Sequence, residues 1–188
     1  MSGTKKFERE LALHTAPAML GVKPANLLTI EGDSRNVSLN IDRFNKKVAQ
    51  KGLHIKELRR VGSRTLMLLY NERLLNKQLC DEEVRKMFRS FGYGGCHDCP
   101  QYLERLCERM AESSDFPHEI GLFLGYPVAD IKGFIANKGR NCLLCGYWKV
   151  YCDAEGARKT FDRYNNCTKY MVECLDKGKD IYSALRIS

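Results

Sequence analysis

The sequence has no long apolar run and few of the residues that mark particular classes of protein. Its 188 residues include one tryptophan and five prolines. The densest apolar run, residues 66–70, has the length of a strand and falls well short of the ~18 apolar residues of a membrane helix. Residues 4–10 are charged and contain no apolar signal-peptide segment. These absences predict a cytoplasmic protein with no membrane partner.

Motifs for phosphate and haem binding are also missing. Neither G-x-G-x-x-G nor G-x-x-x-x-G-K-[ST] occurs, so the glycines of the C-terminal half are expected to serve turns and close packing. The haem-attachment pattern C-x-x-C-H is absent, because His97 lies inside the pair Cys96–Cys99. There is no internal repeat and no block of five like charges.

Hydrophobic residues make up 44% of the chain and charged residues 29%, which is ordinary globular composition. The formal net charge of +8 makes nucleic acid one alternative partner. Arg59, Arg60 and Arg64 would form a basic hairpin tip, and the aromatic strand at 147–151 could stack bases. Because the basic residues are spread along the chain, nucleic-acid binding is not the favoured interpretation.

Helical periodicity dominates the pattern along the chain, and it predicts a helix-rich α+β fold with a β-hairpin and a few short strands. Pro17 is expected to end the first helix, residues 31–36 to form a polar loop, and Gly62-Ser63 to form the hairpin turn. Asp81 and Asp153 suit helix N-termini. The predicted helices are 4–16, 40–51, 81–91, 100–110, a short one from Pro117, one from Pro127, 153–178 and a last turn within 180–187; the predicted strands are 27–30, 55–61, 65–70 and 147–152.

Residues 91–95 break this pattern with three glycines, which suggests a boundary. We therefore expect an N-terminal α+β subdomain with the hairpin, residues 1–92, and a C-terminal helical subdomain, residues 93–188. The two would share a core in one compact domain.

Several short motifs in the chain are characteristic of one family. They are FPHEIG at 116–121, LGYP at 124–127, GFI at 133–135, GYWKVY at 146–151 and LGVKPANL at 20–27. With these motifs the chain resembles the bacterial family called domain of unknown function 3793. The resemblance implies a small single-domain protein, mostly from anaerobic Gram-positive bacteria, with no assigned activity. It supplies no catalytic residue.

Nine cysteines are many for a cytoplasmic chain, and two C-x-x-C pairs stand out: Cys96 with Cys99, and Cys142 with Cys145. Each spacing lets two thiolates reach one metal, so the four sulfurs can complete a tetrahedral site for zinc or an iron–sulfur cluster. The 42 residues between the pairs exceed the ~15–20 of simple zinc ribbons. The alternative is that these cysteines are small buried apolar residues.

The pair Cys96–Cys99 also permits dithiol redox chemistry. Pro100 is expected to open a helix directly after the pair, and a helix N-terminus together with His97 favours thiolate. Asp98 opposes thiolate formation, and no strand precedes the motif as it does in thioredoxin-like sites.

The block 116–148 supplies candidate residues for catalysis or cofactor binding. His118, oriented by Glu119, can act as a general base, and Cys145 or Cys142 can act as a nucleophile beside it. Tyr126, Trp148 and Lys149 are the candidate cofactor contacts. These residues can also have purely structural roles: Glu119 can cap a helix, and Trp148 can belong to the core.

The leading prediction is a non-catalytic, cysteine-based metal-binding or redox-accessory protein that acts with a redox or metal-handling partner. An enzyme with a Cys/His pair in the 116–148 block and a nucleic-acid-binding protein are the two alternatives.

Overall fold

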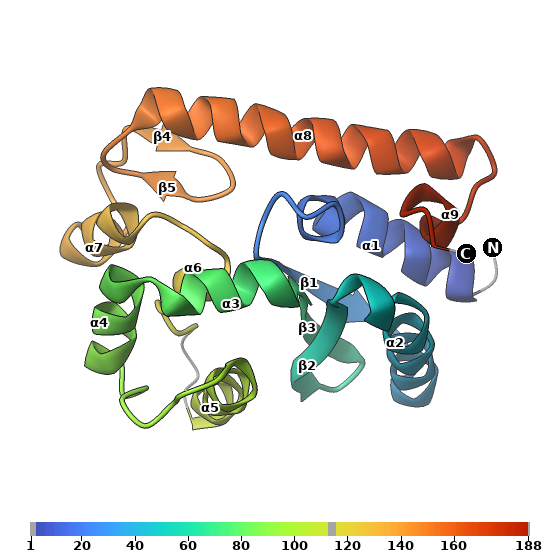
Figure 1. The fold of residues 1–188 in the computed structure, drawn as a ribbon, viewed down its shortest axis with the longest axis horizontal. Coiled ribbons are helices and arrows are strands. Elements are labelled where there is room, and N and C mark those ends of the chain that lie inside the picture. The colour runs from blue at the N-terminus through green and yellow to red at the C-terminus, as the bar shows by residue number, and fades with distance from the viewer. Residues whose placement is uncertain (1–2, 113–115, 188) are drawn as a thin grey trace. The chain divides into compact units, whose positions relative to one another are not determined.

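The computed structural model of the protein describes residues 3–112 and 116–187. Within these residues the fold is α+β: helices predominate, with one three-stranded and one two-stranded antiparallel sheet (Figure 1), which confirms the predicted fold class. The chain divides into two compact units. The first unit comprises residues 1–74 and 166–188, and the second comprises residues 75–165. The boundary expected at 92–93 lies within the second unit.

The first unit is built around the three-stranded sheet, whose strands lie in the order β1-β3-β2. They are β1 (Ala25–Glu31), β2 (Leu53–Val61) and β3 (Arg64–Asn71). Gly62, with φ of +57°, opens the tight turn between β2 and β3, as the sequence predicts. A register shift between Glu57 and Arg59 bulges β2, a distortion that the alternating pattern did not indicate.

Helices cover this sheet and complete the core of the first unit. They are α1 (Gly3–Met19), α2 (Ser34–Val48), the short 3-10 helix η1 (Ala49–Lys51), α9 (Ile181–Ala184) and the C-terminal part of α8 (Ala154–Asp176). The helix α1 packs on β1 and β3, and α2 packs on β2 (Figure 1). The fully buried Leu11, Phe44, Met67, Met171 and Ile181 belong to one apolar cluster.

The first helix does not end at Pro17, so that prediction was wrong. Helix α1 continues to Met19 with Pro17 in its last turn. The missing proline N–H removes one helical hydrogen bond, but the amide of Leu20 still donates to Ala16 and that of Val22 to Pro17, at 2.9 and 2.8 Å. The helix therefore continues to Met19, and the chain turns away at Gly21, which takes a φ of +69°.

The second helix begins within the stretch expected to be a loop. Asp33 caps α2, and its carboxylate accepts the amide of Asn36 at 3.0 Å. The stretch 34–36 is thus the first helical turn, and the predicted start at residue 40 was too late. Gly52 is the C-cap directly after η1, where it takes a left-handed φ of +63°.

The second unit is mainly helical and has an aromatic core. It contains most of α3 (Glu72–Cys80), together with α4 (Glu82–Ser90), α5 (Cys99–Glu112), α6 (Ile120–Phe123), α7 (Val128–Ala136), β4 (Leu144–Cys145), β5 (Lys149–Val150) and the N-terminal half of α8. The ring of Phe88 contacts those of Tyr93, Tyr102 and Phe123, with ring centroids 4.9–5.0 Å apart. The caps predicted at Asp81 and Asp153 are both confirmed.

Three elements of the second unit differ from the prediction, and one of them is the short strand β4, which was not predicted. Helix α3 was not predicted, although Asn71 accepts the amide of Leu74 at 3.1 Å in the manner of a cap. The strand expected at 147–152 is only the two-residue β5. It is short because the amides of Tyr151 and Cys152 donate to the side chain of Asp130 instead of to a neighbouring strand.

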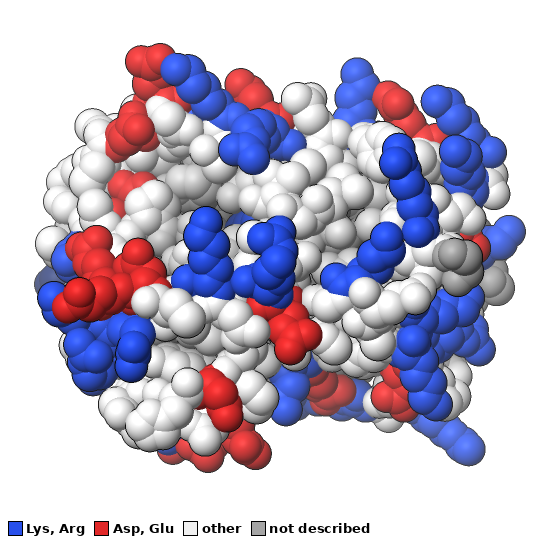
Figure 2. Space-filling view, viewed as in Figure 1, with Lys and Arg blue, Asp and Glu red and all other residues white. Residues whose placement is uncertain are grey.

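The net charge of the protein is confined to one unit. The first unit carries 18 basic and 10 acidic residues, whereas the second carries 13 of each, so the first accounts for the entire +8. On the face shown in Figure 2, basic side chains are interspersed with acidic and uncharged ones. None of the helices formed by residues 3–112 and 116–187 combines the length and the apolar character needed to cross a membrane.

Candidate functional site

Asp130 on α7 is the residue that fixes the β4–β5 hairpin in place. Its side chain is buried, and one carboxylate oxygen, Oδ2, accepts the indole N–H of Trp148 at 2.7 Å. The other, Oδ1, accepts the amides of Tyr151 at 2.7 Å and Cys152 at 3.1 Å. Three donors thus compensate the buried carboxylate, and they hold Trp148 and the start of α8 against α7.

A second buried carboxylate anchors the segment 116–121. Glu119 is 1% exposed, and its Oε1 pairs with Nε of Arg109 on α5 and accepts the hydroxyl of Tyr93 at 3.3 Å. Burial, followed by the negative charge of Glu119, raises the pKa of Tyr93 well above its usual value, so this phenol stays protonated. Glu119 contacts Arg109 and Tyr93 rather than His118, so it does not orient the imidazole as the sequence suggested.

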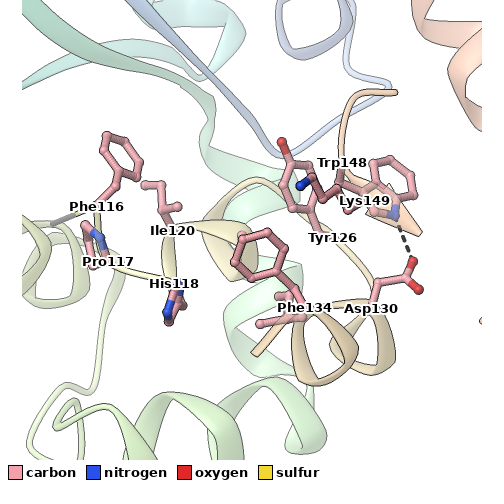
Figure 3. Close-up of a pocket in the computed structure, with 11 residues that line it drawn as sticks. Phe116, Pro117, His118, Ile120, Tyr126, Asp130, Phe134, Trp148 and Lys149 are labelled. Atoms are coloured by element: carbon pink, nitrogen blue, oxygen red, sulfur yellow. Dashed lines mark hydrogen bonds between the residues drawn. The ribbon is translucent and has the colours of Figure 1, made fainter. Parts of the chain in front are cut away.

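Between these two anchors lies a cavity of about 610 Å³, whose described lining residues all belong to the second unit. The walls are mainly apolar: four aromatic rings besides the imidazole of His118, several aliphatic side chains and Gly121. Figure 3 shows the side chains around the cavity and the hydrogen bond from Trp148 to Asp130. The lining consists of Phe116, Pro117, His118, Ile120, Gly121, Tyr126, Asp130, Ile131, Phe134, Trp148 and Lys149.

The structure brings the three predicted cofactor contacts together in this cavity. The rings of Tyr126 and Trp148 lie 5.1 Å apart, and the Tyr126 hydroxyl donates to the carbonyl of Tyr147 at 2.9 Å. Burial raises the pKa of Tyr126 to about 12, which keeps the phenol neutral. Nζ of Lys149 donates to the carbonyl of Gly139 at 2.7 Å and lies 5.9 Å from the ring centre of Phe134.

His118 lines the same cavity at an exposed position. Its ring meets that of Phe134 edge-on, with the centroids 5.5 Å apart. No residue in the described part of the chain forms a hydrogen bond with its imidazole. His118 is thus placed to offer a nitrogen to a molecule in the cavity. Cys142 and Cys145, its proposed nucleophilic partners, are not among the described residues that line the cavity.

Glycines allow the close approaches that shape this region. A Cβ on Gly133 would lie 2.5 Å from the Cβ of Tyr151, so α7 can lie directly against β5 only without a side chain there. A Cβ on Gly146 would lie 2.3 Å from the ring of Phe161 on α8. Neither glycine has a positive φ, so backbone conformation does not require glycine at these positions. The requirement comes from the lack of space for a Cβ.

The two C-x-x-C pairs are not assembled into one site. Within residues 3–112 and 116–187, no group of three or more His, Cys, Asp or Glu side chains is placed to hold a metal ion. Cys96 and Cys99 lie at the start of α5, half-buried and buried, while Cys142 and Cys145 lie at the β4–β5 hairpin. None of the nine cysteines, all of which lie in the described part of the chain, forms a disulfide. The geometry gives no support to the predicted four-thiolate zinc or iron–sulfur site, and the cysteine-based role stays a prediction.

The environment of Cys96 also differs from the one expected of a reactive thiol. Burial raises the pKa of Cys96, and Glu108 and Asp98 raise it further, while Arg105 lowers it. The helix N-terminus therefore does not produce the lowered thiol pKa on which dithiol redox chemistry would depend.

The sequence interpretation missed Asp130 and Phe134 as parts of the site. Asp130 lies in the otherwise apolar run Pro127–Ile131, and an acidic residue in such a run is a signal for a buried, hydrogen-bonded carboxylate. Phe134 lies within the GFI motif, but nothing in its spacing separates a cavity wall from an ordinary core position.

This geometry defines a class of protein: an α+β fold with an aromatic cavity formed by the FPHEIG, LGYP, GFI and GYWKVY segments. The chain belongs to the family described as protein of unknown function DUF3793, whose match covers residues 11–185. No curated protein and no solved structure matches the chain.

Proposed function

We propose that this protein binds a small organic molecule in the aromatic cavity of its second unit and carries out no reaction on it. The supporting observation is the cavity itself, whose volume of about 610 Å³ lies within the ~300–1,000 Å³ of typical ligand pockets. Its apolar walls with a few convergent polar groups have the composition of such pockets.

The contacts around the cavity favour binding over catalysis. Trp148 and Tyr126 have their polar atoms engaged by protein groups, so they present ring faces to the cavity. Rings held in this way offer a large contact area at little cost in side-chain entropy. No cysteine sulfur lines the cavity among the described residues, so its walls supply no thiol nucleophile.

Trp148 provides a direct test, because it is the only tryptophan in the chain. A nitrogen-15-labelled sample gives a single indole N–H signal, which reports on the cavity wall. We expect titration with 1-naphthylacetamide, a neutral aromatic probe, to shift this signal with saturation. A Kd on the order of 1 mM is expected, because ligands of this size gain roughly 0.3 kcal/mol per heavy atom.

The matched controls are two exposed apolar residues. Phe116, 50% exposed, lines the cavity, and Phe116→Ser should weaken binding several-fold. Leu143, 60% exposed, lies outside the lining, and Leu143→Ser should have no effect. An indole signal that does not move, or that moves equally in both variants, would contradict the proposal.

A second candidate function, nucleic-acid binding, is favoured by the location of the charge. The whole net charge of +8 belongs to the first unit. Exposed Arg59 and Arg64 lie near the β2–β3 turn and supply cations for phosphate contacts. The aromatic strand proposed to stack bases lies in the second unit and forms the cavity wall instead, so only the charge supports this candidate.

Binding of a labelled mixed-sequence oligonucleotide at several salt concentrations tests the second candidate. Replacing Arg59 and Arg64 together by Gln should lower the slope of log K against log salt by about 1.5, since each lost phosphate contact changes it by roughly 0.7–0.9. Replacing Arg158 and Arg163 of the neutral second unit in the same way should leave the slope unchanged. Identical slopes in the two double variants would exclude this role for the hairpin.

A further inference from the structure

We infer that the ligand of the aromatic cavity carries an acidic group, a carboxylate or a phosphate, which Lys149 binds with help from His118. This inference rests on the proposed binding function and adds the chemical class of the ligand. The inference follows from a comparison of the polar groups in the lining. Some already form hydrogen bonds within the protein, and others can still form one with a ligand.

Asp130, the carboxylate among the described lining residues, has three of its roughly four acceptor sites occupied. It is 4% exposed, and its two oxygens accept three N–H groups at 2.7–3.1 Å from Trp148, Tyr151 and Cys152. A cationic ligand group would meet a buried carboxylate whose charge three N–H groups already compensate, so pairing with it gains little. The lining therefore does not favour a basic ligand.

Lys149, in contrast, has N–H groups to spare. An ammonium has three donors and no acceptor, and within residues 3–112 and 116–187 one of the three is engaged, by the carbonyl of Gly139 at 2.7 Å. That bond holds the ammonium in place at the lining beside the ring of Phe134. An oxyanion of the ligand would complete the set of acceptors with charge-assisted hydrogen bonds, which are stronger than neutral ones.

His118 and Lys149 both lie close to the aromatic ring of Phe134. The imidazole centroid is 5.5 Å from that of Phe134, and the ammonium of Lys149 is 5.9 Å from it. In Figure 3 the ring of Phe134 lies between the two side chains. Lys149 lies beside the rings of Tyr126 and Trp148 in Figure 3, and His118 lies on the other side of Phe134. A ligand with an aromatic body and one acidic group matches these aromatic walls and the ammonium beside them.

The test compares 1-naphthylacetate with its amide, 1-naphthylacetamide, which has nearly the same shape and no charge. We expect the wild-type protein to bind the acid about tenfold more tightly than the amide, with the ratio falling as salt is added, since salt screens the ion pair. 1-Naphthyl phosphate, titrated in parallel, distinguishes a carboxylate site from a phosphate site according to which of the two acids binds more tightly.

Variants assign the preference to Lys149. Lys149→Gln keeps a donor for the Gly139 carbonyl but removes the charge, so it should lower the affinity for the acid about tenfold and change that for the amide by less than twofold. Lys159→Gln is the matched control, because Lys159 lies on α8 with its partner Glu155 and outside the lining, and both affinities should stay at wild-type values. His118→Ala should weaken binding of the acid by a few-fold.

The outcomes separate the two proposals. Equal binding of acid and amide to the wild-type protein would overturn the inference and leave the binding function intact. A tenfold preference that persists unchanged in Lys149→Gln would also overturn it. If neither probe moves the Trp148 signal, the binding function itself fails. The comparison on wild-type protein keeps the inference testable even if Lys149→Gln does not fold.

Discussion

The carboxylate of Asp130 accepts the indole N–H of Trp148 at 2.7 Å, and this bond joins helix α7 to the hairpin that carries the aromatic wall of the cavity. The same carboxylate accepts two backbone amides beyond β5. One side chain thus fixes both the orientation of the only tryptophan and the path of the chain into α8.

Asp130→Asn tests this arrangement. The amide keeps the size of the side chain, but it carries no charge and places an NH2 group toward N–H donors. Hydrogen bonds to charged groups contribute roughly 1.5–3 kcal/mol each. We therefore expect the free energy of unfolding to fall by at least about 2 kcal/mol. Urea unfolding measures the loss, and the Trp148 indole signal should shift. Asp162→Asn, an exposed site on α8, is the control and should change neither quantity. Equal stability of the two variants would contradict the role of Asp130.

Two tyrosines of the second unit are expected to respond oppositely to loss of their hydroxyl groups. The buried hydroxyl of Tyr151 has no hydrogen-bond partner among the described residues, whereas that of Tyr126 donates to Tyr147 at 2.9 Å. Tyr151→Phe should stabilise the protein slightly, because it removes a hydroxyl that has no hydrogen-bond partner among the described residues. Tyr126→Phe should destabilise it by about 1 kcal/mol, because the half-buried carbonyl of Tyr147 loses this donor. Thermal unfolding of both variants distinguishes these signs, and a loss of stability in Tyr151→Phe would show that its hydroxyl is satisfied.

The glycines at the close approaches should not tolerate alanine. Gly146→Ala places a methyl group 2.3 Å from the Phe161 ring, and Gly133→Ala places one 2.5 Å from Tyr151. We expect each to cost about 1–3 kcal/mol, the usual range for overpacking. Gly95→Ala is the control, since a Cβ there meets nothing within 4 Å and its φ is negative. If all three variants unfold at the same denaturant concentration, the close packing around the hairpin is not as described.

Lys23 should make the stability of the first unit depend on pH. It is 2% exposed, and burial lowers its pKa to about 7, from about 10.4 in an unfolded chain. Between pH 7 and 10.4 the unfolded state holds a proton that the folded state has lost, so stability rises with pH across this window and is constant below it. The destabilisation is therefore greatest at pH 7 and below.

Lys23→Met removes this burial cost. We expect it to raise the free energy of unfolding at pH 7 by a few kcal/mol, at roughly 1.4 kcal/mol per pKa unit, and to flatten the rise toward pH 10. Lys51→Met, at an exposed position, should keep the wild-type pH dependence. Urea titrations at pH 7 and pH 10 measure both effects, and parallel curves for wild type and Lys23→Met would disprove the prediction.

Metal analysis should separate the cysteine hypothesis from the cavity hypothesis. Since Cys96, Cys99, Cys142 and Cys145 are not grouped as ligands, protein purified without oxygen should contain well under one zinc or iron per chain. Replacing Cys96 and Cys142 by Ser should not change naphthylacetate binding. A stoichiometric metal that is lost in this double variant would revive the four-thiolate site.

Local features of the fold were predictable from the sequence, whereas the site was predictable only in part. The caps at Asp81 and Asp153 and the Gly62 turn depend on a few neighbouring residues, and all three are confirmed. Tyr126, Trp148 and Lys149 were proposed together, but the role of Asp130 could not be foreseen, because it depends on bonds to residues 18 to 22 positions away. The C-x-x-C spacing describes one pair and carries no information about a second pair 42 residues further on.

The division of the chain also bears on the order in which its parts are synthesised. The first unit needs Met171, Ile181 and Tyr182 to complete its apolar cluster, although it begins at the N-terminus. The second unit is one continuous segment, and all of it has left the ribosome before these residues do. The sequence of the cavity-bearing unit is therefore complete during translation before that of the other unit, whose apolar cluster still needs residues 171–182.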